Sequence, residues 1–108
     1  MTVRFGRYLR HKFNAVPKVA DGIRFASTKE ADYYGRLKMR MRPGGDVLFF
    51  LRQVPVHLPG GIRYVVDFLE FHNDGSVHFS DVKGFKTRQY LTKKKQVEAI
   101  YPIKIEEV

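Results

Sequence analysis

Two strand-like runs separated by Asn73-Asp74-Gly75 constrain the fold of this chain more than any other feature. "IRYVVDFLEF" (62–71) and "SVHFSDVK" (76–83) are rich in β-branched and aromatic residues, and the second alternates apolar and polar side chains. A three-residue loop with Gly75 in the left-handed conformation would place His72 opposite Ser76. The two runs therefore predict an antiparallel hairpin with a single register.

This register determines which side chains share a face. It brings apolar residues together in two cross-strand pairs, Phe71 with Val77 and Leu69 with Phe79. We expect that face to lie in the core. At its end the same register places Asp67 opposite Asp81, where two carboxylates about 5 Å apart would repel by about 3 kcal/mol at an effective dielectric constant of about 20.

A cation would relieve this repulsion. Lys83 lies two residues beyond Asp81 and supplies one on the same face. A Mg²⁺ or Mn²⁺ ion held by Asp67, Asp81 and a backbone carbonyl would do more, because hard divalent ions prefer oxygen ligands. Two carboxylates, a divalent metal and a lysine together are suited to the hydrolysis of phosphodiesters.

The remaining elements predict an α/β fold. A helix over 27–41 is indicated by Ser27 as N-cap and Glu30 three residues later, a spacing that forms a capping box. A strand follows over 47–56, interrupted late by Pro55, and precedes the predicted hairpin. A second helix over 87–100, capped by Thr87, and a short strand over 103–108 complete the order α-β-β-β-α-β, which we expect to form a mixed sheet flanked by helices.

The charge distribution favours a polyanionic partner. The 108 residues carry a net charge of +9, and residues 1–45 hold 11 basic against 3 acidic residues. We expect residues 1–20 to form a basic, flexible N-terminal arm and residues 21–108 to form one domain. The absence of cysteine and of a long apolar run predicts a cytoplasmic protein without a membrane segment.

These acids and the lysine resemble the motif of the PD-(D/E)xK nuclease superfamily, which has a restriction-endonuclease-like fold. The shared pattern is Asp67, then Asp81-Val82-Lys83 after a hairpin, with Glu30 on the preceding helix. Over about residues 11–107, "DGIRFASTKEADYYGRL", "VVDF", "DVKGFKT" and "KKK…YPIKI" resemble small phage-encoded proteins similar to endonuclease I and Holliday junction resolvases. A proline often precedes the first acid of that family, whereas Val66 stands there in this chain.

The resemblance implies a Mg²⁺-dependent endonuclease that cuts branched DNA such as a four-way junction. It implies catalytic roles for Glu30, Asp67, Asp81 and Lys83, and a metal bound by Asp67, Asp81 and the carbonyl of Val82. Symmetric cutting of a four-way junction needs two active sites, so we expect a homodimer. Candidate DNA contacts are basic residues around the site, namely Arg63, Lys86, Arg88, Lys93 and Lys94.

Several alternatives remain open at this stage. Glu30 could act only as the third residue of a capping box, and Gln53 would approach Asp67 only if the first hairpin has the right parity, since a slip of one residue puts Arg52 there. The protein could also be a non-catalytic nucleic-acid-binding module on the same fold, or a basic ribosome-associated protein. Neither of these functions has a use for paired acids at positions 67 and 81.

Overall fold

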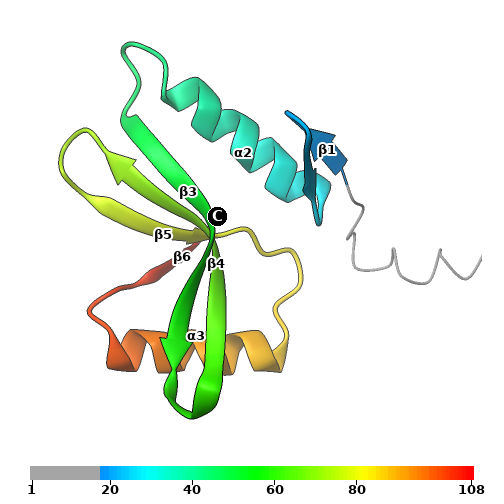
Figure 1. Cartoon of the computed structure of the whole chain (residues 1–108), viewed down its shortest axis with the longest axis vertical. Coiled ribbons are helices and arrows are strands. Elements are labelled where there is room, and N and C mark those ends of the chain that lie inside the picture. The colour runs from blue at the N-terminus through cyan, green and yellow to red at the C-terminus, as the bar shows by residue number, and fades with distance from the viewer. Residues whose placement is uncertain (1–17) are drawn as a thin grey trace, which may run out of the picture.

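The computed structural model describes residues 18–108. The elements follow one another in the order β1 (Lys18–Ala20), β2 (Ile23–Phe25), α2 (Thr28–Arg40), β3 (Val47–Leu58), the 3₁₀ turn η2 (Pro59–Gly61), β4 (Ile62–His72), β5 (Val77–Asp81), α3 (Arg88–Ile100) and β6 (Ile105–Glu107). From α2 onward the expected succession of helices and strands is present (Figure 1).

The main sheet has four strands in the order β3-β4-β5-β6. The pairs β3–β4 and β4–β5 are antiparallel, whereas β5–β6 is parallel because α3 carries the chain back to the same end. The expected mixed sheet with two helices is therefore present.

The order of the whole chain differs from the prediction, because β1 and β2 form an extra hairpin before α2. Its turn is Asp21-Gly22, and both residues have positive φ, 51° and 75°. Two left-handed residues in an Asp-Gly pair are what a tight two-residue hairpin requires. The predicted arm over 1–20 thus overlaps β1 at Lys18–Ala20, and the rest of that prediction, residues 1–17, lies outside the described residues.

The predicted hairpin register is confirmed. Leu69 pairs with Phe79 and Phe71 with Val77, as expected. The amide of His72 donates to the carbonyl of Ser76 at 2.9 Å, and Gly75 has φ 89°. The three-residue loop with a left-handed Gly75 therefore sets the register of these two strands.

The prediction that the Leu69–Phe79 face lies in the core holds only at one end. Phe79 is partly buried and packs against the α3 core cluster, whereas Val77 at the other end is exposed. The opposite face is the more deeply buried one, because Phe68, Glu70 and Ser80 are all buried. Alternation fixes which residues share a face, but it does not say which face the helices cover. Tyr33 of α2 explains the unexpected burial of Glu70, since its hydroxyl donates to that carboxylate.

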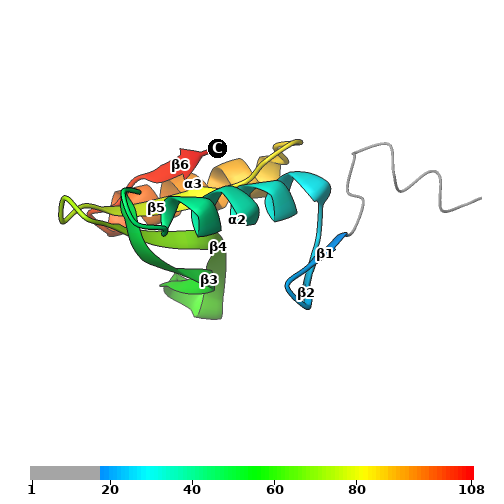
Figure 2. The ribbon, with the colours of Figure 1, turned by 90° about the horizontal axis from the view of Figure 1, so that it is seen from above.

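Each helix closes one part of the core. Phe68 and Val47 pack with Tyr34 and Leu37 of α2, whereas Val66 packs with α3 near the other end of the hairpin. In Figure 1, α2 lies beside one half of the long β3–β4 hairpin and α3 crosses the other half. Figure 2 shows β5 running between the two helices. The middle of the hairpin, around Asp67, therefore lies where the two packed regions meet.

Some element bounds differ from the prediction. β3 runs on to Leu58, with Pro55 paired to Val65, because an edge strand tolerates proline. β5 ends at Asp81 rather than Lys83, and β6 is only three residues long. Asp81 therefore stands at the last position of a strand, and Lys83 lies in the loop that follows.

Two glycine substitutions should change stability in opposite directions. Gly75→Ala should lower the free energy of unfolding by about 1–2 kcal/mol, because φ 89° is unfavourable for a residue with a Cβ atom. Gly35→Ala, in the interior of α2 with nothing within 4 Å of the added Cβ, should raise it by about 0.5–1 kcal/mol. Urea unfolding of both variants checks the signs, and equal shifts would contradict the assigned backbone conformations.

Candidate functional site

Three of the four sequence-predicted catalytic residues line one pocket. A cavity of about 550 Å³ is lined by Glu30 from α2, Asp67 from β4 and Val82 and Lys83 from the loop after β5. Ser27, which caps α2, also lines it, so the cap places Glu30 at the pocket wall. The buried Asp81 lies behind this wall and adjoins both Asp67 and Lys83.

Asp67 and Asp81 are joined through the backbone rather than simply facing each other. The Asp67 amide donates to Oδ1 of Asp81 at 2.9 Å, and the Val82 amide donates to Oδ2 of Asp67 at 3.0 Å. The regular ladder between β4 and β5 ends one residue earlier, at Phe68 and Ser80. Each carboxylate thus takes the place of a carbonyl acceptor at the point where the strands separate.

Asp81 carries an unsatisfied oxygen. The residue is fully buried, and its Oδ2 has no hydrogen-bond partner. The nearest cation is the ammonium of Lys83, whose Nζ is 4.0 Å from Oδ2. Since a buried carboxylate oxygen without a partner costs about 1–3 kcal/mol or more, a proton or a bound cation at this atom would stabilise the folded protein.

Lys83 is held by contacts that sequence reasoning did not identify. Its Nζ lies over the ring of Tyr90, 4.7 Å from the ring centroid, and its carbonyl accepts a hydrogen bond from Lys29 at 2.9 Å. Tyr90 follows the α3 cap at Thr87, which fixes the ring beside the loop. The one sequence signal for the contact between Lys83 and Tyr90 is the helical spacing that puts Tyr90 and the lysines of α3 on one side of that helix.

Glu30 is almost fully buried and is held by two consecutive residues of β3. Gln53 donates from Nε2 to Oε2 of Glu30 at 3.3 Å and to Oδ1 of Asp67 at 3.4 Å. The guanidinium of Arg52 lies 3.9 Å from the same Oε2. Both residues named as alternatives beside Asp67 are therefore part of the site, and Gln53 is the one opposite Asp67.

The backbone of Gln53 is strained at this position. Successive residues of a strand normally point to opposite faces. Gln53, however, has φ 52°, in the left-handed region that a non-glycine residue occupies at a cost of about 1–2 kcal/mol. The pairing of β3 with β4 keeps its register on both sides of this residue, from Arg52 to Val54. The strained residue is the one whose side chain bridges two carboxylates, and strain of this kind concentrates at functional sites.

Burial dominates the electrostatics of the acids. It raises the pKa of Asp81 above its ordinary value, while the hydrogen bond from Asp67 and the charge of Lys83 oppose the shift. Burial also raises the pKa of Glu30, with a further contribution from the charge of Asp67. Both acids therefore hold their protons more tightly than they would in water, as expected for carboxylates gathered without a compensating ion.

The predicted DNA contacts are distributed over two regions. Lys86 and Lys94 both pair with Glu107, at 2.9 Å and 3.4 Å, and with Tyr90 they lower the pKa of that carboxyl to about 2. Lys93 approaches the carbonyl of Arg63 at 3.5 Å, near the β3–β4 turn. Arg88 is exposed at the start of α3. Two of the five candidate cations therefore already neutralise an acid.

The donor set fits a hard cation in part. Within residues 18–108, no three histidine or acidic side chains are gathered closely enough to form a complete metal site. Asp67 and Asp81 supply two carboxylates, and the buried Oδ2 of Asp81 has no hydrogen-bond partner of its own. Mg²⁺ is commonly held by one or two carboxylates and completed by water and substrate phosphate. The residues present are compatible with that kind of ion.

A protein-family model described as "Protein of unknown function (DUF1064)" matches residues 10–106 of the chain. The chain belongs to this family. A comparison with curated proteins finds no match. In the part of this DUF1064 protein that the structure describes, neither helix has the length and apolar character needed to cross a membrane.

Replacing Asp81 should make the DUF1064 protein less sensitive to pH. Because the pKa of Asp81 is raised on folding, its contribution to stability is present below the ordinary pKa of about 4 and is lost as pH rises past it. Without divalent ions, Asp81→Asn should therefore gain on the order of 1 kcal/mol over the wild type between about pH 4 and pH 7. Urea midpoints across this range check it, with the exposed Asp32→Asn on α2 as the control.

Proposed function

We propose that this protein is a metal-dependent, structure-specific DNA endonuclease that cuts branched DNA, with a four-way junction as its substrate. The observation that carries the proposal is the buried Oδ2 of Asp81, which has no hydrogen-bond partner and lies beside Asp67 and Lys83. A binding module would lose stability by keeping such an atom, whereas a metal-dependent hydrolase uses it as a ligand.

Asp67, Asp81 and the carbonyl of Val82 are the groups that would hold a Mg²⁺ or Mn²⁺ ion. When bound there, the ion supplies a lowered pKa for a coordinated water and positive charge for the phosphate. The hydrogen bonds described above orient the two acids, since Val82 and Gln53 fix Asp67 and the amide of Asp67 fixes Asp81. Such hydrogen bonds to the ligands are a common feature of metal sites.

Lys83 places a positive charge on the pocket wall. Phosphodiester hydrolysis adds water across a P–O bond and increases the negative charge on the phosphoryl oxygens, which a nearby ammonium stabilises. The ring of Tyr90 contacts this ammonium through a cation–π interaction, and the carboxylate of Asp81 is its ion-pair partner. Lys83 is therefore suited to orient the attacking water or to stabilise the pentacovalent phosphate.

Glu30 is the acid suited to a proton-transfer role. Its pKa is raised by burial and by Asp67, which moves it toward the range in which a carboxylate can accept and return a proton near neutral pH. Gln53 and Arg52 fix the position of Oε2, so the carboxylate is already oriented before substrate binds. The capping contact between the Glu30 amide and Ser27 is a second role for the same residue.

A nucleic acid is the substrate that the charge favours. The net charge of +9 supports binding to a polyanion, and the exposed cations Arg63 and Arg88, with the half-buried Lys93, would contact phosphates without reading sequence. The choice of branched DNA rests on the resemblance of the sequence to phage junction-cutting enzymes. Symmetric cutting of such a junction would require a homodimer with two sites.

The proposal predicts Mg²⁺-dependent cleavage of a labelled four-way junction. Asp67→Asn and Asp81→Asn should each lower the cleavage rate about 100-fold or more, because each removes a charged ligand. Linear, nicked and flapped DNA of the same sequence should be cut more slowly than the junction. Denaturing gels of all four substrates, with and without Mg²⁺, measure both effects.

Asp32→Asn is the matched control, because Asp32 is an exposed acid on α2 whose described ion pair is with Lys18. It should cut like the wild type. Junction binding without cleavage in any divalent metal would refute the nuclease and favour the non-catalytic binding module instead. Cleavage that survives in both Asp→Asn variants would show that the activity belongs to a different site.

A further inference from the structure

The face of the sheet opposite α2 carries an apolar surface that the proposed active site does not use. Six side chains form it in two cross-strand rows, and we call them the open face: Phe49, Leu51, Leu69, Phe71, Val77 and Phe79. Three of them are nearly half exposed, with Phe49 at 45%, Leu51 at 48% and Val77 at 47%. Exposed apolar side chains gathered on adjoining strands indicate an interaction surface.

One end of the open face bears a stacked pair of rings, which we call the projection. Phe49 and Phe71 stack across β3 and β4 with their centroids 4.4 Å apart and an interplanar angle of 11°. The pair lies near the start of β3 and the end of β4. Stacked rings form a rigid apolar projection, because little side-chain freedom is left for a partner to restrict.

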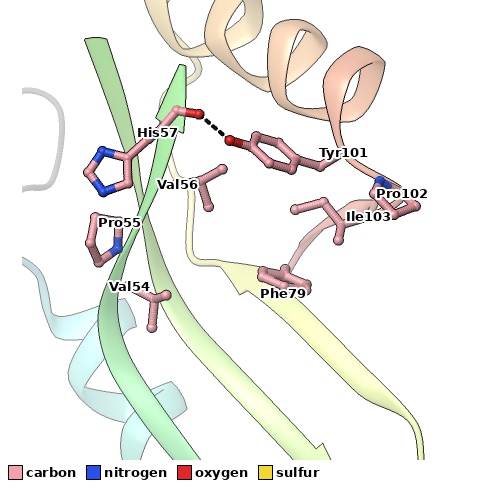
Figure 3. A pocket seen from close by; sticks show the side chains of 8 residues that line it. All are labelled: Val54, Pro55, Val56, His57, Phe79, Tyr101, Pro102 and Ile103. Atoms are coloured by element: carbon pink, nitrogen blue, oxygen red, sulfur yellow. Dashed lines mark hydrogen bonds between the residues drawn. The ribbon is translucent and has the colours of Figure 1, made fainter. Parts of the chain in front are cut away.

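The other end bears a hollow. A pocket of about 300 Å³ lies between the second half of β3 and the segment that joins α3 to β6, with Phe79 of the open face in its wall (Figure 3). Its lining is mostly apolar, contributed by Val54, Val56 and Ile103. The hydroxyl of Tyr101 donates to the carbonyl of His57, so these two polar groups satisfy each other at the rim.

We propose that the open face is the interface of a two-fold symmetric homodimer, in which the Phe49–Phe71 rings of each copy enter the pocket of its partner. Phe49 and Pro55 are six positions apart along β3, which places projection and hollow about 20 Å apart on one hairpin. A projection and a matching hollow on one surface are what an isologous contact requires. Leu51 and its cross-strand partner Leu69 lie between them, where the two-fold axis would pass.

Charge favours a second copy at this face. Each copy carries +9, so two copies repel unless the surfaces that meet lack lysine and arginine. None of the six open-face residues is charged. For the same reason the open face is a poor surface for DNA, whose affinity depends on cations that contact phosphates.

The available area is sufficient for a modest dimer. The open face and the pocket together expose on the order of 400 Å² of apolar surface, against about 800 Å² per partner in a stable interface of standard size. The remainder would come from the polar residues around the face. A dissociation constant in the micromolar range is therefore expected rather than a nanomolar one.

The homodimer is the partner that the proposed symmetric cleavage requires, so its purpose rests on the proposed function. Its existence can be tested without any cleavage assay. Sedimentation equilibrium of the full chain without DNA should give twice the monomer mass of 12.6 kDa at high concentration. Leu51→Glu should shift the protein to a monomer, because two carboxylates would meet near the axis. Circular dichroism should show an unchanged fold, since Leu51 is exposed.

Leu91→Glu is the matched control, because Leu91 on α3 is 46% exposed and the substitution changes the charge equally. It should remain dimeric. Mixing Leu51→Glu with Leu51→Lys should restore a dimer through opposite charges at the axis. A wild type that is monomeric at about 200 µM, or a Leu51→Glu variant as dimeric as the wild type, would overturn the proposal.

Two further outcomes would assign the open face to a different partner and would also overturn the dimer proposal. One is a monomer whose affinity for the junction falls on Leu51→Glu, and the other is a monomer that binds a different protein through this face. If the dimer forms as expected but no DNA is cut, the interface stands and the nuclease proposal fails. If a monomer cuts DNA, the nuclease proposal stands and the interface proposal fails.

Discussion

The hydrogen bonds that join Asp67 and Asp81 to the backbone are the interaction on which the site depends. Two strands that have paired regularly separate there, and each carboxylate accepts an amide proton that would otherwise lose its partner. These hydrogen bonds bind the acids firmly at the strand ends and explain how two like charges are tolerated so close together. They leave Oδ2 of Asp81 without a hydrogen-bond partner, and the proposed chemistry follows from that atom.

The strain at Gln53 is linked to the same arrangement. In a regular strand, Arg52 and Gln53 would point to opposite faces, and Glu30 would lose one of its two partners. Both nevertheless approach Glu30, and the left-handed backbone of Gln53, at a cost of about 1–2 kcal/mol, coincides with this contact. The rest of the hairpin supports this strain, because Val66 and Phe68 on either side of Asp67 are fully buried.

The sequence predicted the hairpin register and the caps of both helices because these depend on local chemistry, namely the Asn-Asp-Gly turn and the side chains of Ser27 and Thr87. It also predicted that Glu30, Asp67 and Lys83 come together, partly through a family resemblance. It did not predict that Phe68 and Glu70 face inward. Both faces of β4 carry apolar and polar side chains, and only the position of the helices decides which face is buried. The roles of Tyr90 and of the left-handed Gln53 depend on tertiary contacts, and no local pattern encodes them.

The central claim is that Asp67 and Asp81 form a ligand pair for a divalent ion. Calorimetric titration of the wild type and of Asp81→Asn with Mn²⁺, in the absence of DNA, tests it most directly. We predict saturable binding by the wild type, competition by Mg²⁺, and at least about tenfold weaker binding by Asp81→Asn, because one of the two carboxylates becomes neutral. Equal binding by both proteins, or no binding by the wild type at millimolar Mn²⁺, would contradict the claim.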